Sequence, residues 1–189
     1  MKALLTISRV IDGITTLFGR LSWWVTLLMI VIGILNVITR YVGRSFGLSL
    51  GGTGYIALQT YAFDFVFLMA AAYVFRVDGH VRVDIIFSNL RERTKAVIDI
   101  LGTLFLLLPF CILGLQFSYP YVMRSWRQGE VNVSAGGLPV YPAKALILAA
   151  FVLLIVQGVS QIIKNAAFLA GHTDSGSPHS RVTDQTEAI

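Results

Sequence analysis

The sequence predicts an all-α integral membrane protein with four transmembrane helices. Its 189 residues are 56% hydrophobic and their mean hydropathy is +0.74. A soluble domain cannot bury that much apolar surface. A membrane-spanning helix needs about 20 mostly apolar residues. Stretches that satisfy this requirement lie at residues 21–42, 55–77, 96–119 and 143–168, which together define a transmembrane domain over 21–168.

The distribution of positive charge predicts that both termini are cytoplasmic. The formal net charge is +5, from 15 Lys and Arg residues against 10 Asp and Glu residues. Ten of the basic residues lie in the N-terminal segment, the second loop and the C-terminal tail. Basic residues concentrate on the cytoplasmic side of membrane proteins. The basic excess therefore reports topology, and we expect no nucleic-acid partner.

Residues 1–20 predict an amphipathic helix that lies on the cytoplasmic surface of the membrane. Apolar side chains recur at helical spacing, with Arg9, Asp12, Thr16 and Arg20 mostly on the opposite face. A cleaved signal peptide is the rival interpretation. It is disfavoured because Arg9 and Asp12 interrupt the apolar core and no small-residue cleavage pattern follows.

Polar side chains inside the first two spans indicate a contact between them. An acid such as Asp64 is costly within a span, so it is a functional candidate by default. Asn36 and Arg40 are four residues apart and share one helix face. Asp64 and Asn36 lie about 13 Å and 9 Å from the outer ends of their spans at 1.5 Å per residue. We favour a polar clamp of Asn36 and Arg40 with Asp64. Contact with a partner subunit and an ion or proton site are the alternatives.

Prolines and a polar tail mark the second half of the chain. Pro109 predicts a kink in the middle of the third span, and Pro120 predicts its outer end. Pro142 suits the first turn of the last span. The tail, residues 169–189, is rich in Ser and Thr and is predicted to be disordered in the cytoplasm.

Enzyme chemistry is not supported by the sequence. The single cysteine, Cys111, lies in the third apolar run and cannot build a disulfide framework or a metal cluster. None of the three histidines lies within a span, which argues against haem ligation. Asp78, His80 and Asp84 could bind a metal, but a turn with surface charges is the favoured interpretation. We therefore expect neither an enzyme nor a resident cofactor or metal.

Two loop motifs resemble a known family. The second loop reads "RVDGHVRVD", and the third reads "SWRQGEVNVSAGGLPVYPAKALI" as it leads into the last span. Together, at these positions, they resemble the small permease subunit of tripartite ATP-independent periplasmic (TRAP) transporters. The resemblance covers residues 20–168. A longer Gly-rich first loop and Asp64 depart from the family pattern, which leaves the subfamily and the substrate open.

The resemblance implies a function and partners. Family members work with a large multi-span permease subunit, which holds the substrate and sodium sites, and with a periplasmic substrate-binding protein. The small subunit enlarges a fixed scaffold against which a mobile domain moves like an elevator. Transported substrates are typically organic acids, and transport uses the sodium gradient across the bacterial inner membrane. The alternatives are an autonomous four-span channel or small carrier, and a membrane anchor for a redox enzyme.

The two motifs also supply candidate interface residues. We expect the cytoplasmic turn to contact the lipid surface and the large subunit, and the third loop to meet the binding protein. The turn comprises Arg76, Asp78, Gly79, His80, Arg82 and Asp84. The docking candidates are Arg124, Trp126, Arg127, Glu130, Gly137, Leu138, Pro139, Pro142 and Lys144.

Overall fold

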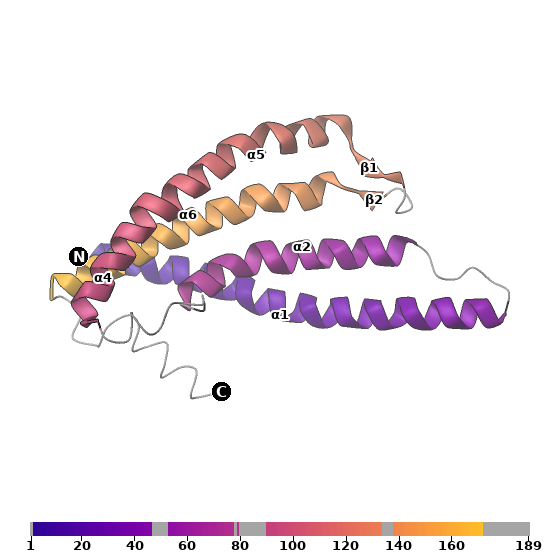
Figure 1. The fold of residues 1–189 in the computed structure, drawn as a ribbon, viewed down its shortest axis with the longest axis horizontal. Coiled ribbons are helices and arrows are strands. Elements are labelled where there is room, and N and C mark those ends of the chain that lie inside the picture. Colours follow the sequence, from indigo (N-terminus) through magenta and orange to yellow (C-terminus); the bar gives the residue numbers. More distant parts are fainter. Residues whose placement is uncertain (1, 47–52, 78, 80–89, 134–137, 172–189) are drawn as a thin grey trace. The chain divides into compact units, whose positions relative to one another are not determined.

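A computed structural model describes residues 2–46, 53–77, 79, 90–133 and 138–171, and these are almost entirely helical (Figure 1). Among them, four helical stretches are long and apolar enough to cross a membrane. The all-α multi-span prediction is therefore confirmed. In chain order the elements are α1 (Lys2–Ser45), α2 (Thr53–Arg76), α4 (Glu92–Gly102), the π-helical turn η1 (Thr103–Leu107), α5 (Leu108–Gln128), strands β1 (Val131–Asn132) and β2 (Leu138–Pro139), and α6 (Tyr141–Leu169).

Helix α1 does not end at residue 20, where a separate surface helix was expected to stop. It continues without a break to Ser45. Protein covers part of its polar side: Ser8 and Thr15 are fully buried, whereas Arg9 and Arg20 are exposed, as are the apolar Ile7 and Val10. The position of this segment relative to the membrane surface stays a prediction.

The third span contains a π turn just before Pro109, where a kink was expected. Proline has no N–H, so it cannot bond the carbonyl one turn earlier. The helix widens over Thr103–Leu107, and the Leu108 N–H donates to the Thr103 carbonyl, five residues back. The widened turn thus accommodates Pro109 inside one continuous span.

The expected end of this span at Pro120 is wrong, because α5 continues through Pro120 to Gln128. The helix ends at Gly129, whose φ of 57° lies in the left-handed region. The Glu130 N–H donates to the Ser125 carbonyl and the Gly129 N–H to the Trp126 carbonyl. This pair of bonds is a Schellman motif, which satisfies the last carbonyls of a helix.

The chain forms two compact units. The first comprises Met1–Leu17, Ala71–Gly114 and Phe151–Ile189, and the second comprises Phe18–Ala70 and Leu115–Ala150. In the first unit, small residues let helices approach closely, as is common between membrane helices. A Cβ added to Gly114 would lie 2.5 Å from the Phe151 ring, and one on Gly158 would lie 3.0 Å from Leu107.

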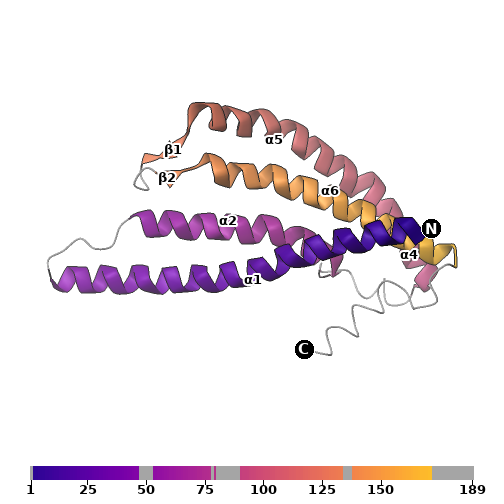
Figure 2. The same ribbon diagram turned by 180° about the vertical axis from the view of Figure 1, so that it is seen from behind.

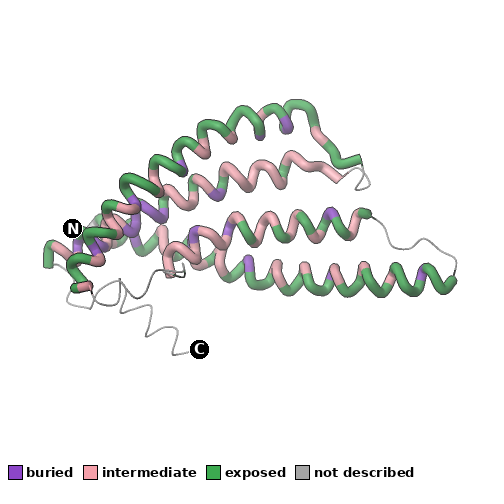
Figure 3. The backbone as a smooth tube through the Cα atoms, viewed as in Figure 1, coloured by how far each residue is buried: buried purple, intermediate pink, exposed green. Residues whose placement is uncertain are grey.

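In the second unit, α1 and α2 run side by side in opposite directions (Figures 1 and 2). They meet where a Cβ on Gly33 would lie 3.1 Å from the Gln59 amide nitrogen. Most of the remaining α1 surface is exposed (Figure 3). Large apolar side chains dominate this surface, with Trp23 81% and Trp24 67% exposed. Such a surface suits lipid or a partner helix rather than water.

Candidate functional site: two polar clusters

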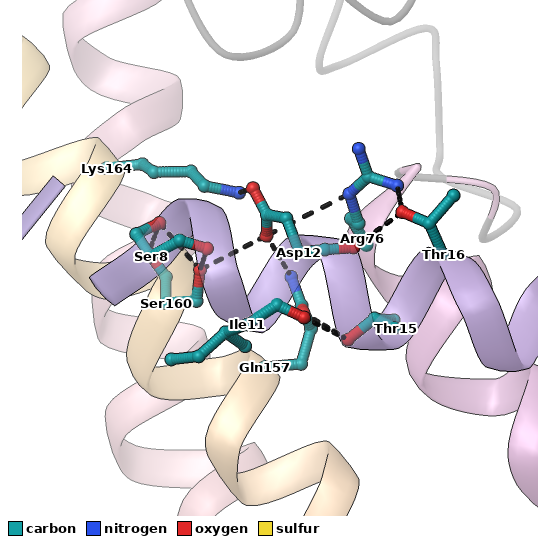
Figure 4. Close-up of polar contacts among 9 residues, drawn as sticks. All are labelled: Ser8, Ile11, Asp12, Thr15, Thr16, Arg76, Gln157, Ser160 and Lys164. Atoms are coloured by element: carbon teal, nitrogen blue, oxygen red, sulfur yellow. Dashed lines mark hydrogen bonds and ion pairs between the residues drawn. The ribbon is translucent and has the colours of Figure 1, made fainter. Parts of the chain in front are cut away.

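Asp12 lies at the centre of a polar cluster that joins three helices of the first unit (Figure 4). Its carboxylate lies 2.5 Å from the Lys164 ammonium nitrogen and 3.9 Å from the Arg76 Nε. Lys164 lies at Oδ2, whereas Arg76 lies at Oδ1, and Ser160 Oγ and Gln157 Nε2 each donate to this same Oδ1 at 3.2 Å. We call this set the Asp12 cluster; its members are Ser8, Asp12, Thr15, Thr16, Arg76, Gln157, Ser160 and Lys164.

Helical spacing brings the cluster together. On α1, Ser8, Asp12 and Thr15 follow one another at intervals of four and three residues, so they share a face. The α6 members Gln157, Ser160 and Lys164 share a face by the same spacing. Across the two faces the Ser8 and Ser160 hydroxyl oxygens are 2.7 Å apart, and Thr15 donates to Gln157 Oε1 at 2.8 Å.

The cluster contains both full burial and partial exposure. Ser8, Thr15, Gln157 and Ser160 are buried. The three charged side chains retain some contact with solvent, with relative exposures of 16% for Asp12, 23% for Lys164 and 24% for Arg76. Buried hydroxyls and amides need partners, and these residues satisfy one another across α1 and α6. The cluster can therefore fasten helices, with a carboxylate neutralised by two cations.

Arg76 connects this cluster to the predicted cytoplasmic turn. Its guanidinium donates to the Thr16 hydroxyl in addition to its pairing with Asp12. Gly79 follows the end of α2 as expected, and its N–H donates to the Val74 carbonyl at 2.9 Å. An added Cβ would lie 3.3 Å from Val74 Cγ1, so close approach is what favours glycine here.

The remaining turn residues, Asp78, His80, Arg82 and Asp84, lie outside the described residues. The interface and metal hypotheses for them are therefore not addressed by the geometry. Among the residues that the structure describes, no three His, Cys, Asp or Glu side chains gather closely enough to hold a metal ion.

A second polar cluster fixes the connection between α5 and α6 in the second unit. Glu130 accepts hydrogen bonds from Lys144 at 2.5 Å and from Ser125 at 2.6 Å. The Lys144 ammonium also lies 4.3 Å from the centre of the Tyr121 ring. These donors hold the pKa of the Glu130 carboxyl below its usual value, with the Lys144 hydrogen bond as the main cause. We call this set, Tyr121, Ser125, Glu130 and Lys144, the Glu130 cluster.

The backbone beside the Glu130 cluster forms a short antiparallel ribbon. Val131 pairs with Pro139 and Asn132 with Leu138, and the Val140 N–H donates to the Glu130 carbonyl at 2.9 Å. The Trp126 and Tyr141 rings meet edge to face, 4.9 Å between centroids. Pro142 lies in the first turn of α6, as the sequence predicts. Gly137 lies outside the described residues.

The structure does not bring Asp64 to Asn36 and Arg40. Among the described residues, no hydrogen bond or ion pair joins it to either. The Gly33–Gln59 contact sets the register of the two antiparallel helices. In that register Asp64 lies about 12 Å along the helix axis from Asn36 and about 18 Å from Arg40, at 1.5 Å per residue. The clamp was inferred from predicted span ends, and α1 extends beyond them in both directions.

A family model supplies the decisive comparison. The model described as "Tripartite ATP-independent periplasmic transporters, DctQ component" matches residues 29–168 of the 189. The chain belongs to this family. It is therefore the small membrane component of a TRAP transporter and not an enzyme, which rules out the redox-enzyme anchor in favour of the TRAP resemblance. Neither curated proteins nor solved structures gave a match.

The matched range divides the Asp12 cluster. Arg76 and the α6 members lie within the residues shared with other DctQ components, whereas Ser8, Asp12, Thr15 and Thr16 precede them. The Glu130 cluster lies wholly inside the matched range. Glu130 and Lys144 were among the predicted docking residues, whereas the contacts between Asp12 and α6 were not predicted. Each of the two segments carries polar residues at helical spacing, which was the available sequence signal. A single sequence does not show that these two polar faces contact each other.

Proposed function

We propose that this DctQ component is the scaffold and docking subunit of a sodium-coupled secondary transporter in the bacterial inner membrane. The transporter would import organic acids that a periplasmic binding protein delivers. Substrate and sodium would bind in a large multi-span permease subunit, against which this chain supplies fixed surface. Both termini would lie in the cytoplasm, in line with the excess of basic residues in the N-terminal segment, the second loop and the C-terminal tail.

The scaffold role is supported mainly by the contrast between the exposed and the buried residues of the chain. Large apolar side chains are exposed along α1, as at Trp23 and Trp24. Many of the buried residues are polar, and those of the Asp12 cluster are bonded across helices within the chain. A carrier needs polar groups that line a substrate path near the middle of the membrane. Buried polar contacts that hold the helices together, combined with an exposed apolar surface, suit a scaffold subunit.

The Glu130 cluster supports a docking role for the connection between α5 and α6. The ion pair, the Schellman motif and the ribbon hold this segment in a defined shape. Val131 and Val133 are exposed on it, and Trp126 is half exposed beside them. Exposed apolar and aromatic side chains on a rigid loop are typical of protein interfaces. We propose that the binding protein contacts this loop.

Co-purification from native membranes tests the scaffold role. The tagged chain should retain a large multi-span permease in mild detergent, and proteoliposomes of the pair should take up an organic acid only with binding protein and an inward sodium gradient. Replacing sodium with potassium should abolish uptake. The chain reconstituted alone is the matched control and should transport nothing. Substrate flux through the chain alone would favour an autonomous carrier.

A further inference from the structure

Helix α5 carries a hollow on the face turned away from its packing side. Its volume is about 420 Å³. Successive residues of an α-helix are rotated by about 100° around its axis, so the residues that line the hollow lie on the side of α5 opposite the buried Val122 and Ser125. The hollow is therefore open toward whatever surrounds the subunit. It is lined by Tyr119, Pro120, Met123, Arg124, Arg127 and Gln128.

Two arginines dominate the chemistry of this hollow. Arg124 and Arg127 are three residues apart, so their guanidinium groups project from neighbouring turns of one face. Both residues are exposed, and none of the described acidic side chains forms an ion pair with either. The nearest acid in sequence, Glu130, is already bonded to Lys144 and Ser125. The hollow thus offers two positive charges that the described part of the chain leaves uncompensated.

Its remaining wall is apolar and lies toward the middle of the helix. Tyr119, Pro120 and Met123 precede the arginines and lie closer to the middle of the apolar helical stretch Glu92–Gln128, which contains all five residues. Tyr119, Tyr121 and Trp126 mark this end of α5 as interfacial, since such aromatics gather at the headgroup level. A cationic rim next to an apolar floor matches the two parts of a lipid.

We propose that Arg124 and Arg127 bind the phosphate of a membrane phospholipid whose glycerol and upper acyl chain lie along Tyr119, Pro120 and Met123. Guanidinium groups match phosphate oxygens in geometry and charge. A soluble protein arriving from the aqueous side reaches the arginines but not the apolar floor, which favours lipid over the docking role first expected for these two residues. This site is independent of the proposed sodium-coupled function.

Lipid retention by the purified full-length chain provides the first test. Native mass spectrometry would follow the binding of added phosphatidylglycerol to delipidated protein in detergent. Each of Arg124→Gln and Arg127→Gln should weaken retention about fivefold, in line with the contribution of one basic residue near anionic headgroups. Arg124→Lys should retain most of the binding. Arg44→Gln, an exposed cation at the end of α1, should change nothing.

Two outcomes of this titration would overturn the proposal. The first is equal phosphatidylglycerol binding by the double Arg124→Gln, Arg127→Gln variant and the unaltered protein. The second is displacement of the bound lipid by millimolar inorganic phosphate, which would reassign the arginines to a free anion. Retained helicity of the double variant, measured by circular dichroism, excludes unfolding as the cause of lost binding.

Photo-crosslinking distinguishes lipid from protein as the occupant. A benzoylphenylalanine at position 123, in the assembled transporter in native membranes, should give a phospholipid adduct in the mass spectrum. The same group at position 133, where Val133 is 85% exposed on the loop, serves as the control and should give little lipid adduct. An adduct only with the periplasmic binding protein or the large subunit at position 123 would contradict the proposal.

Discussion

Replacing Asp12 with leucine should weaken the first unit by a measurable amount. The substitution keeps the size of the side chain but removes its bonds to Gln157, Ser160 and Lys164. Polar contacts between membrane helices contribute about 0.6 kcal/mol each in double-mutant cycles. Three lost contacts therefore amount to about 2 kcal/mol. The Lys164 ammonium also loses its nearest counter-charge, but its partial exposure keeps that cost small.

This loss corresponds to about a thirtyfold change in the unfolding equilibrium constant. The assay is unfolding in mixed micelles with increasing sodium dodecyl sulfate, followed by circular dichroism. Arg9→Leu is the matched control, since Arg9 is a charged residue of the same helix segment that is exposed, and it should unfold like the original protein. A double variant Asp12→Lys, Lys164→Asp should recover part of the loss.

The geometry itself can be checked separately with cysteines at positions 8 and 160 in a Cys111→Ala background. The two hydroxyl oxygens that they replace are 2.7 Å apart, so oxidation should join the helices rapidly. Failure of this pair to crosslink, or equal unfolding of the Asp12→Leu and Arg9→Leu variants, would refute the role given to the cluster.

Three more substitutions have defined outcomes. Gly114→Ala should destabilise the protein by about 1–3 kcal/mol in the same unfolding assay, because the new Cβ would meet the Phe151 ring at 2.5 Å; adding Phe151→Leu should restore part of it. The pKa of Glu130 is lowered from 4.5, chiefly by Lys144, so the stabilisation from this pair is complete above pH 4.5 and is lost as the pH falls through the lowered pKa. Protease cleavage of the loop between α5 and α6 should therefore increase as the pH is lowered. In the Glu130→Gln variant, which lacks the carboxylate, the loop should be cleaved readily at every pH. Asp64→Asn should reduce co-purification of the large subunit without altering the sodium dependence of uptake; an altered dependence would instead indicate an ion site.

The number of spans could be predicted because it depends on length and apolarity alone. Helix ends were harder to predict, as Pro120 shows. A proline removes one hydrogen bond from a helix but does not oblige it to stop. The true end depends on the left-handed residue Gly129 and on the bonds that Glu130 and Gly129 make back to α5. The Schellman motif at Gly129, and not Pro120, therefore determines where α5 ends.

The Asp12 cluster shows what a single sequence leaves open about a site. The alternation of polar and apolar residues near the N-terminus predicted an amphipathic helix over residues 1–20. That pattern is the same whether water or protein covers the polar face. Only the structure shows that Gln157 and Ser160 cover it, from a helix far along the chain. Glu130 and Lys144 were both named as docking candidates in one loop motif, but their ion pair was not predicted.

The sequence separation within the Asp12 cluster has a consequence for biosynthesis. Asp12 and Ser160 are 148 residues apart, and chains are synthesised at about 5–20 residues per second. Synthesis therefore reaches Ser160 about 7 to 30 s after it has passed Asp12. Of the two cations that pair with Asp12 in the described part of the chain, Arg76 at the end of α2 is synthesised before Lys164. Arrival of α6 then completes the cluster, so release of the nascent chain and closure of the first unit fall close together in time.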